Sequence, residues 1–245
     1  MDRMIYLSMT GAKSLMQRQD ALTHNLANAA TDGFRADLMT ARAVPVRQDG
    51  TATTRVYNVE TTTGFDAAQG PARQTGSPLD IAVRGSGWLS VIGPDGNEGY
   101  TRGGSLTVDD QGVLMTRGGL PVMGDGGPIT IPLNAEVSIG SDGTVSAKVG
   151  NQPSLPLGTL KLVDPPVAEL EKGPDGLVRL KTGVPADVDP AVQVADGVLE
   201  GSNVNVVEAM VGMIEVARQF EMQMKLLQNT EANEQRAAQL LTLKG

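Results

Sequence analysis

The sequence predicts an α+β fold in which long N- and C-terminal helices pack as an assembly-dependent coiled-coil layer and a mainly-β domain lies between them. Three observations lead to this prediction. Apolar residues recur at helical spacing near both ends, short alternating runs and Asp-Gly turns fill the middle, and the last apolar stripe is longer than a small β domain can cover. The predicted segments are an N-terminal helix at 1–32, an extended β connector at 33–76, a central β domain at 77–181, a return linker at 182–201 and a C-terminal helix at 202–245.

The first segment reads as one helix from about Asp2 to Ala30. Its residues alternate spacings of three and four, which places them on a single narrow stripe. These residues are Ile5, Ser8, Ala12, Leu15, Gln19, Leu22 and Leu26, widened by Met9 and Met16. Thr31-Asp32-Gly33 provides the stop, because Gly33 can take the left-handed conformation beyond a helix end.

The middle of the chain changes to a period of two. Extended pieces are expected around Val44 to Val46 and Thr54 to Val59, followed by about ten short strands between Thr75 and Leu180. Asp95-Gly96, Asp142-Gly143 and Asp175-Gly176 are dipeptides typical of hairpin turns. An all-β centre with a polar, proline-containing return linker follows from this pattern.

The last segment, Val206 to Leu243, carries the stronger helical pattern. Its three-four alternation has the period of a coiled-coil seam. The seam comprises Val206, Met210, Met213, Ala217, Phe220, Met224, Leu227, Glu231, Glu234, Ala238 and Leu241. Asn205 with Glu208 has the spacing of a capping box, so the helix start is well specified. A helix of this size is about 57 Å long, so its stripe needs a partner, first the other terminal helix and then copies in other subunits.

Composition excludes several classes of protein. The formal net charge of −8 provides no positive field for nucleic acid. Residues 1–47 have a net charge of +2 and residues 201–245 of −1, which leaves −9 for residues 48–200. The chain has no cysteine, so it forms no disulfide or thiolate metal site. The N-terminus does not resemble a cleaved signal peptide, and no stretch reaches the ~18 apolar residues of a membrane span.

Residues with catalytic potential do not form a recognisable site in the sequence. The one histidine, His24, lies inside the first predicted helix, and Gly85-Ser86-Gly87 lacks the third glycine of a nucleotide loop. Acidic runs such as Asp109-Asp110-Gln111-Gly112 read as turns, because they lack the order of a calcium loop. We therefore expect no enzyme activity, no cofactor, no metal and no small-molecule substrate.

Three motifs resemble those of the flagellar rod and hook protein family. The run Asn25-Leu26-Ala27-Asn28-Ala29-Ala30-Thr31-Asp32-Gly33-Phe34-Arg35 is similar to the family's N-terminal signature. Thr75 to Val83 with Tyr100 to Leu106 resembles its central pieces, and Glu200 to Asn205 its C-terminal signature. The resulting N-terminal assembly motif is Asn25, Leu26, Ala27, Asn28, Thr31, Gly33, Phe34 and Arg35. The C-terminal assembly seam is Ser202, Asn203, Asn205, Met210, Met213, Ala217, Phe220, Met224 and Leu227.

The resemblance implies a structural subunit of the bacterial flagellar basal body, most similar to the proximal-rod members. Such proteins are exported through the flagellar type III apparatus without a cleaved signal. They polymerise with other axial subunits and copies of themselves, so that the rod transmits torque and its wall encloses the export channel. Partners would then be axial subunits and the export apparatus, with no nucleic acid and no membrane insertion. Three alternatives stay open: a distal-rod subunit, a homo-oligomeric coiled-coil β binding module, and a hydrolase with a site in the β domain.

Overall fold

The computed structural model describes residues 2–45 and 56–242, which form two compact units. The first unit comprises Met1–Ala27, Asp37–Gly64 and Asn205–Gly245, and the second comprises Asn28–Ala36 and Phe65–Val204. Each unit is therefore assembled from stretches that are far apart in the sequence. The predicted extended residues at Val46 and Thr54-Arg55, and the predicted helix end at Leu243, lie outside the described residues.

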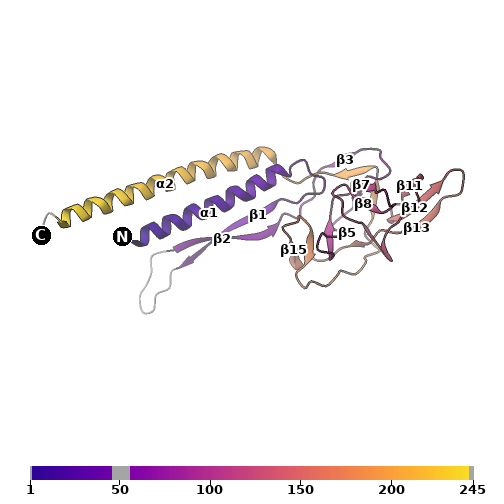
Figure 1. Cartoon of the computed structure of the whole chain (residues 1–245), viewed down its shortest axis with the longest axis horizontal. Coiled ribbons are helices and arrows are strands. Elements are labelled where there is room, and N and C mark those ends of the chain that lie inside the picture. The colour runs from indigo at the N-terminus through magenta and orange to yellow at the C-terminus, as the bar shows by residue number, and fades with distance from the viewer. Residues whose placement is uncertain (1, 46–55, 243–245) are drawn as a thin grey trace. The chain divides into compact units, whose positions relative to one another are not determined.

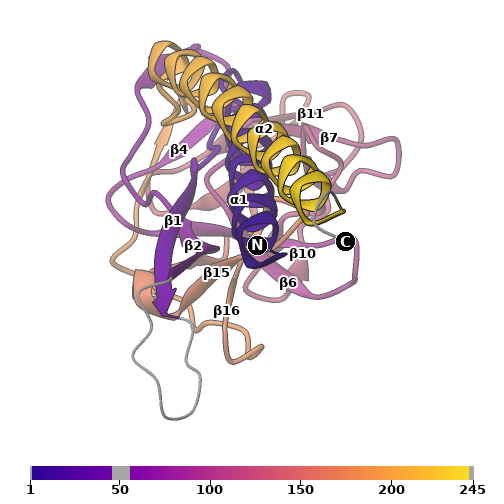
Figure 2. The ribbon, with the colours of Figure 1, turned by 90° about the vertical axis from the view of Figure 1, so that its left-hand side faces the viewer.

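The first unit contains two helices and a hairpin (Figure 1). Helix α1 is Asp2–Ala27 and helix α2 is Val206–Thr242, while strands β1 (Asp37–Pro45) and β2 (Val56–Phe65) form a two-stranded sheet. The two helices lie side by side, and β1 contacts α1 (Figure 2). Neither helix has, within its described residues, an apolar stretch that would reach across a membrane.

The helix ends follow from local sequence. The side-chain oxygen of Asn205 accepts hydrogen bonds from the backbone N–H groups of Val207 at 3.1 Å and Glu208 at 3.3 Å. Asn205 is therefore the N-cap of α2, as predicted. Beyond α1, the Thr31 N–H donates to the Asn28 carbonyl, and Gly33 has a φ of 71°. Gly33 is left-handed, as predicted, but α1 ends at Ala27 and not at about Ala30, so this glycine lies six residues beyond the helix.

The second unit is mainly β. Its strands are β3 (Ala72–Gln74), β4 (Ile81–Val83), β5 (Trp88–Ile92), β6 (Glu98–Thr101), β7 (Leu106–Val108), β8 (Leu114–Thr116), β9 (Met123–Gly124), β10 (Gly127–Pro128), β11 (Ala135–Ile139), β12 (Thr144–Val149), β13 (Leu155–Thr159), β14 (Leu162–Val163), β15 (Leu170–Lys172), β16 (Val178–Leu180), β17 (Val194–Asp196) and β18 (Val198–Glu200), with a 3-10 helix η1 at Val167–Glu169. A five-stranded sheet has the order β14-β5-β6-β16-β15, and a three-stranded sheet has the order β11-β12-β13. The predicted Asp-Gly turns are present, since Gly96, Gly143 and Gly176 all have φ near 80°.

The last two strands of this unit pair with its first two strands. Strand β17 pairs antiparallel with β4, and β18 pairs antiparallel with β3. The larger apolar core includes fully buried Leu89, Val91 and Leu114 together with Val194 of β17. A smaller core surrounds Trp88 and includes Phe65, Tyr100, Val163, Leu170 and Val178. Residues 194–200 are therefore part of the folded β unit.

The predicted assembly-dependent coiled-coil layer is wrong. The α+β class agrees with two helices and a mainly-β centre, but α2 packs against α1 of the same chain. The covered stripe of α2 also differs from the predicted coiled-coil seam, because Ala209 and Val216 are buried whereas Met210, Ala217 and Met224 of the seam are exposed. Gly11 of α1 faces Gln223, whose side-chain amide donates to the Ser8 carbonyl at 3.1 Å. The heptad pattern had named the other terminal helix as the first partner of α2, but it does not reveal which stripe of α2 that helix covers.

Candidate functional site

Asn25 connects α1 to the hairpin of the first unit. Its side-chain amide donates to the Asp37 carbonyl at 3.0 Å, and its oxygen accepts from the Asp37 N–H at 2.8 Å. The side chain therefore pairs with the start of β1 as a strand backbone would. His24 Nδ1 lies 2.6 Å from Oδ2 of the same aspartate. The first asparagine of the N-terminal motif thus fixes where the hairpin leaves the helix.

The later part of the N-terminal motif, residues 28–35, lies in the second unit. The Gly33 N–H donates to the Glu200 carbonyl at 2.7 Å, and a Cβ at Gly33 would lie 2.1 Å from the Arg102 carbonyl carbon. Glycine is thus required twice, for its positive φ and for this close approach. Phe34 is buried, with the Lys172 ammonium 3.9 Å from its ring centroid. This segment is therefore held by residues distant in sequence.

Two buried arginines share one buried glutamate in the second unit. Arg35 Nη2 lies 2.6 Å from Glu200 Oε1, and Arg102 Nη1 lies 3.1 Å from Glu200 Oε2. The side chains of both arginines are 2% exposed and that of Glu200 is 6% exposed. The Gly70 N–H also donates to Glu200 Oε1 at 3.0 Å. We call Arg35, Arg102, Glu200 and Trp88 the charge cluster.

The charge cluster carries one more positive than negative charge. Burial lowers the pKa of Arg102, and the neighbouring Glu200 carboxylate opposes that shift. Trp88 offers further compensation, because the guanidinium carbons of Arg35 and Arg102 lie 5.9 and 5.4 Å from its ring centroid. The Arg102 guanidinium additionally donates to the carbonyls of Val83 and Gly85. The cluster therefore joins Arg35, Trp88, Arg102 and Glu200, with the carbonyls of Val83 and Gly85, into one network.

Asn203 of the C-terminal motif is a second connecting residue. Its side-chain oxygen accepts from the Ala36 N–H at 2.8 Å, and its amide donates to the carbonyls of Asp66 and Ala68, both at 3.0 Å. Its own N–H donates to the Phe34 carbonyl. Neighbouring Ser202 is buried, and its hydroxyl accepts from the Val204 N–H. Asn203 therefore ties the segments that enter and leave the second unit.

Of the other residues of the N-terminal motif, Leu26 and Ala27 lie in the last turn of α1, and Asn28 and Thr31 follow that helix. Leu26 is half-buried, Ala27 is exposed, and the Thr31 hydroxyl donates to the side-chain oxygen of Asn28 at 3.2 Å. These contacts are local, in contrast to the long-range contacts of Gly33, Phe34 and Arg35.

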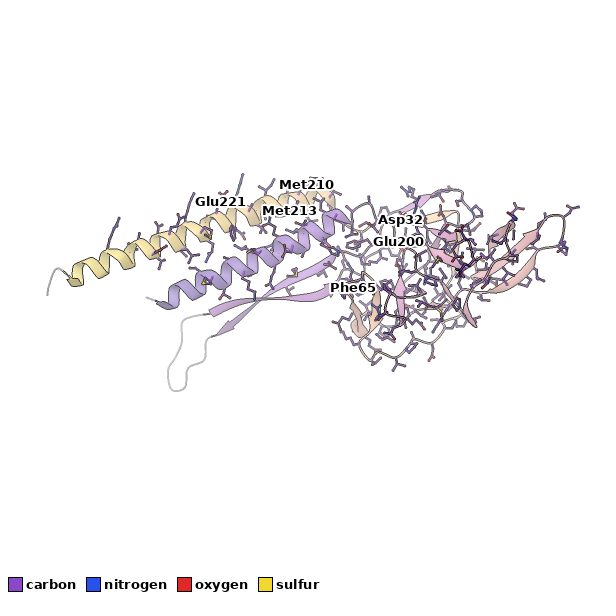
Figure 3. The ribbon with its side chains drawn as sticks, in the orientation of Figure 1. Asp32, Phe65, Glu200, Met210, Met213 and Glu221 are labelled. Atoms are coloured by element: carbon purple, nitrogen blue, oxygen red, sulfur yellow. The ribbon has the colours of Figure 1, made fainter. Side chains whose placement is uncertain are left out.

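The helix pair divides the predicted C-terminal seam into two sets. Met213 lies against α1, where its sulfur accepts from the Thr23 hydroxyl at 3.7 Å, and Phe220 and Leu227 are half-buried (Figure 3). Met210, Ala217 and Met224 are exposed instead. Ala209 and Val216 are the buried residues of the described part of α2. The stripe of α2 that α1 covers is therefore displaced from the predicted seam. The two share Met213, Phe220 and Leu227, but not Met210, Ala217 or Met224.

Several residues of these networks were absent from the predicted sites. Arg102 and Glu200 occur in the central and C-terminal motifs, but nothing in the sequence pairs them with Arg35. Gln223 and Gly212 lie beside the predicted seam and not in it, and both contact α1, with a Cβ at Gly212 falling 3.3 Å from Leu22. No pattern in the sequence indicates these two contacts, because the predicted stripe of α2 is not the one that α1 covers. Among the residues whose side chains the structure describes, no three His, Asp or Glu side chains gather as metal ligands would.

Comparison with known proteins identifies relatives over the whole chain. The family model described as flagellar hook protein FlgE/F/G D1 domain matches residues 82–147, and that described as flagellar basal body rod FlgEFG protein C-terminal matches residues 195–240. The chain is 44% identical to the flagellar basal-body rod protein FlgF of Escherichia coli K12 and 45% identical to that of Salmonella typhimurium LT2, covering 99% of this chain and 100% of each relative. It is 32% identical to the flagellar basal-body rod protein FlgG of Buchnera aphidicola (subsp. Schizaphis graminum), covering 96% of this chain and 98% of the relative.

Proposed function

The chain belongs to the flagellar basal-body rod protein family, and we propose that it acts in the proximal rod, where it joins other axial subunits, transmits torque and forms part of the export channel wall. It is a structural subunit of the flagellar basal-body rod. The observation that carries this function is the 44–45% identity to FlgF proteins over 99% of the chain.

Assembly with other axial subunits follows from family membership, and we propose which residues contribute. Met210, Ala217 and Met224 lie outside the stripe that α1 covers, and Met210 is 48% exposed. Burying such side chains against a neighbouring subunit is favourable, because apolar surface leaves water. Asn25, Gly33, Phe34, Arg35 and Asn203 would then act indirectly, by holding each unit in the form that presents this surface.

The proposed role involves no catalysis, no cofactor and no small-molecule substrate, since the family is a structural component of the rod. Transit to the basal body through the flagellar export apparatus, without a cleaved signal, belongs to the same proposal. The support is the similarity over the full length to FlgF proteins.

Gene deletion and complementation test the function. We expect a strain that lacks this gene to lose swimming in soft agar and to regain it with the wild-type gene. A tagged copy should co-purify with basal bodies, and a deletion strain that still builds complete, motile flagella would contradict the role. A triple Met210→Glu, Ala217→Glu, Met224→Glu variant should fail to complement, while Met9→Glu, an exposed methionine of α1, serves as the matched control.

Placement along the rod separates the proximal role from the distal alternative. Support for the proximal position is the 44–45% identity to the FlgF proteins of Escherichia coli and Salmonella typhimurium. The Buchnera aphidicola (subsp. Schizaphis graminum) relatives do not separate the two positions, because the identity is 32% to FlgG and 31% to FlgF. Labelling the tagged copy in intact basal bodies should place it at the cytoplasmic end of the rod. Label at the distal end would instead support the FlgG-like position.

A further inference from the structure

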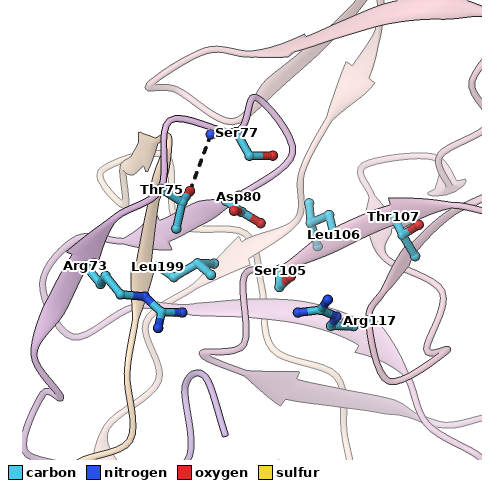
Figure 4. Close-up of a pocket in the computed structure, with 9 residues that line it drawn as sticks. All are labelled: Arg73, Thr75, Ser77, Asp80, Ser105, Leu106, Thr107, Arg117 and Leu199. Atoms are coloured by element: carbon cyan, nitrogen blue, oxygen red, sulfur yellow. Dashed lines mark hydrogen bonds between the residues drawn. The ribbon is translucent and has the colours of Figure 1, made fainter. Parts of the chain in front are cut away.

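A polar cleft of about 440 Å³ lies in the second unit among β3, β18 and the β7–β8 hairpin. Arg73 and Arg117 stand on opposite sides, with Ser105 and Leu199 between them (Figure 4). The cleft uses no residue of the charge cluster. Five of its lining residues belong to the central motif pieces, namely Thr75, Ser77, Asp80, Ser105 and Leu106.

The two arginines of this cleft are weakly compensated. Arg73 Nη2 lies 3.5 Å from Asp32 Oδ1, beyond the usual hydrogen-bond distance, and its side chain is 69% exposed. Arg117 is exposed and forms no ion pair with any described residue. A guanidinium presents five N–H donors in a fork that matches a carboxylate. Both cations are therefore available to an anionic group from outside the chain.

The hydroxyl groups in the cleft are available as well. In the described part of the chain, the side chains of Ser77, Ser105 and Thr107 form no hydrogen bond, whereas the Thr75 hydroxyl accepts from the Ser77 N–H (Figure 4). Three free hydroxyls beside two guanidiniums make a surface rich in donors. Such a surface favours a ligand with several acceptor oxygens.

The Asp80 carboxylate restricts which anionic ligands can bind in the cleft. Its carboxylate lines the same cleft and makes no hydrogen bond or ion pair with the described residues. A ligand that carries only negative charge would be repelled by Asp80, so the fitting ligand also carries N–H donors. A peptide segment with Asp or Glu side chains satisfies both requirements, since its carboxylates reach the arginines and its backbone N–H groups reach Asp80.

We infer that this cleft binds an acidic peptide segment of an adjacent rod subunit. The charge of the chain supports a protein partner of this kind, because a subunit of similar composition, with a net charge of −8, presents carboxylates in excess. Arg73 and Arg117 form a positive site on this acidic protein. The inference rests on the proposed function, which supplies the adjacent subunit.

Site-specific photo-crosslinking in flagellated cells tests the inference on the full chain. A benzophenone amino acid replaces Thr107, which is exposed at the edge of the cleft. We expect a crosslink to a peptide of an axial subunit that contains Asp or Glu. In the double variant Arg73→Glu, Arg117→Glu the yield should fall at least about tenfold, because like charges then face each other. Arg84→Glu, which reverses an exposed arginine outside the cleft, should leave the yield unchanged.

Further measurements distinguish a failure of this inference from a failure of the proposed function. The double variant must have the same midpoint of urea unfolding as the wild-type protein. If its midpoint differs, the Arg73→Gln, Arg117→Gln double variant is used in its place. Reversing the acidic residue of the captured peptide to Arg should restore the crosslink to the double variant. Wild-type protein present in basal bodies without a crosslink, or with a crosslink to glycan or to a peptide without acidic residues, overturns the inference alone. Wild-type protein absent from basal bodies overturns the proposed function and the inference with it.

Discussion

The Glu200 carboxylate lies 2.6 Å from the guanidinium of Arg35, although 165 residues separate them in sequence. Arg35 belongs to the first segment of the β unit and Glu200 to its last strand, β18. The contact therefore connects the two places where the chain enters and leaves this unit. Because Glu200 also pairs with Arg102, one carboxylate compensates two buried cations.

Replacing Glu200 with glutamine should destabilise the β unit strongly. The shape stays nearly the same, but Arg35 and Arg102 lose their counter-charge in a buried site. We expect a loss of about 3–5 kcal/mol in the free energy of unfolding, as when one partner of a buried ion pair is removed. Urea denaturation followed by Trp88 fluorescence measures this change. Glu171→Gln, at an exposed position of β15, is the control, and equal unfolding midpoints for the two variants would contradict the role of the cluster.

Gly33→Ala and Gly76→Ala form a matched pair. Both glycines have positive φ, 71° and 73°, but a Cβ at Gly33 would clash with the Arg102 backbone, whereas a Cβ at Gly76 meets nothing within 4 Å. Gly76→Ala should cost about 1–2 kcal/mol for the left-handed conformation alone. Gly33→Ala should cost clearly more, because the Arg102–Gly103 backbone must also move. Thermal unfolding of the two variants compares them, and similar losses would show that the close approach is unimportant.

The stability of the α1–α2 pair should depend strongly on Val216 and only weakly on Val211. Val216 is fully buried and Val211 is 50% exposed, so the same change to alanine removes very different amounts of buried apolar surface. We expect Val216→Ala to lower the stability of the helical unit by about 2 kcal/mol and Val211→Ala by less than about 0.5 kcal/mol. Far-ultraviolet circular dichroism during thermal unfolding monitors the helices. If Val211→Ala were the more damaging, α2 would pack through a different stripe.

The Asp175–Arg179 ion pair should contribute to stability above acidic pH only. Its hydrogen bond from Arg179 lowers the pKa of Asp175, and that of Arg179 is raised by the same contact. A carboxyl with a depressed pKa stabilises the fold above its unfolded pKa of about 3.9 and loses that contribution as the pH falls through the lower folded value. Asp175→Asn should therefore lower the urea midpoint at pH 7 and have little effect well below pH 3. A difference that persists unchanged at pH 2 would rule out an ionic contribution.

Some features of the fold were predictable because their causes are local. Asn205 caps α2 through N–H groups two and three residues away, and Gly96, Gly143 and Gly176 adopt the backbone that Asp-Gly turns require. The family motifs were likewise recognisable as short runs of residue types. The charge cluster was not, because Arg35, Arg102 and Glu200 appear in three separate motifs, and polar residues in a motif look the same whether they are buried or solvated.

The sequence alone determined the two helices, the β-rich centre between them, the caps and turns, and membership of the rod protein family, since each depends on neighbouring residues or on the residue types themselves. Only the tertiary structure decided which stripe of α2 is covered, and it corrected the predicted coiled-coil layer, because packing depends on the close approach permitted by Gly11 and Gly212 on facing helices. It also decided that Glu200 meets Arg35 and Arg102. A hydrogen-bonded ion pair requires atoms within about 3 Å of each other, and sequence spacing does not specify such a distance across 165 residues.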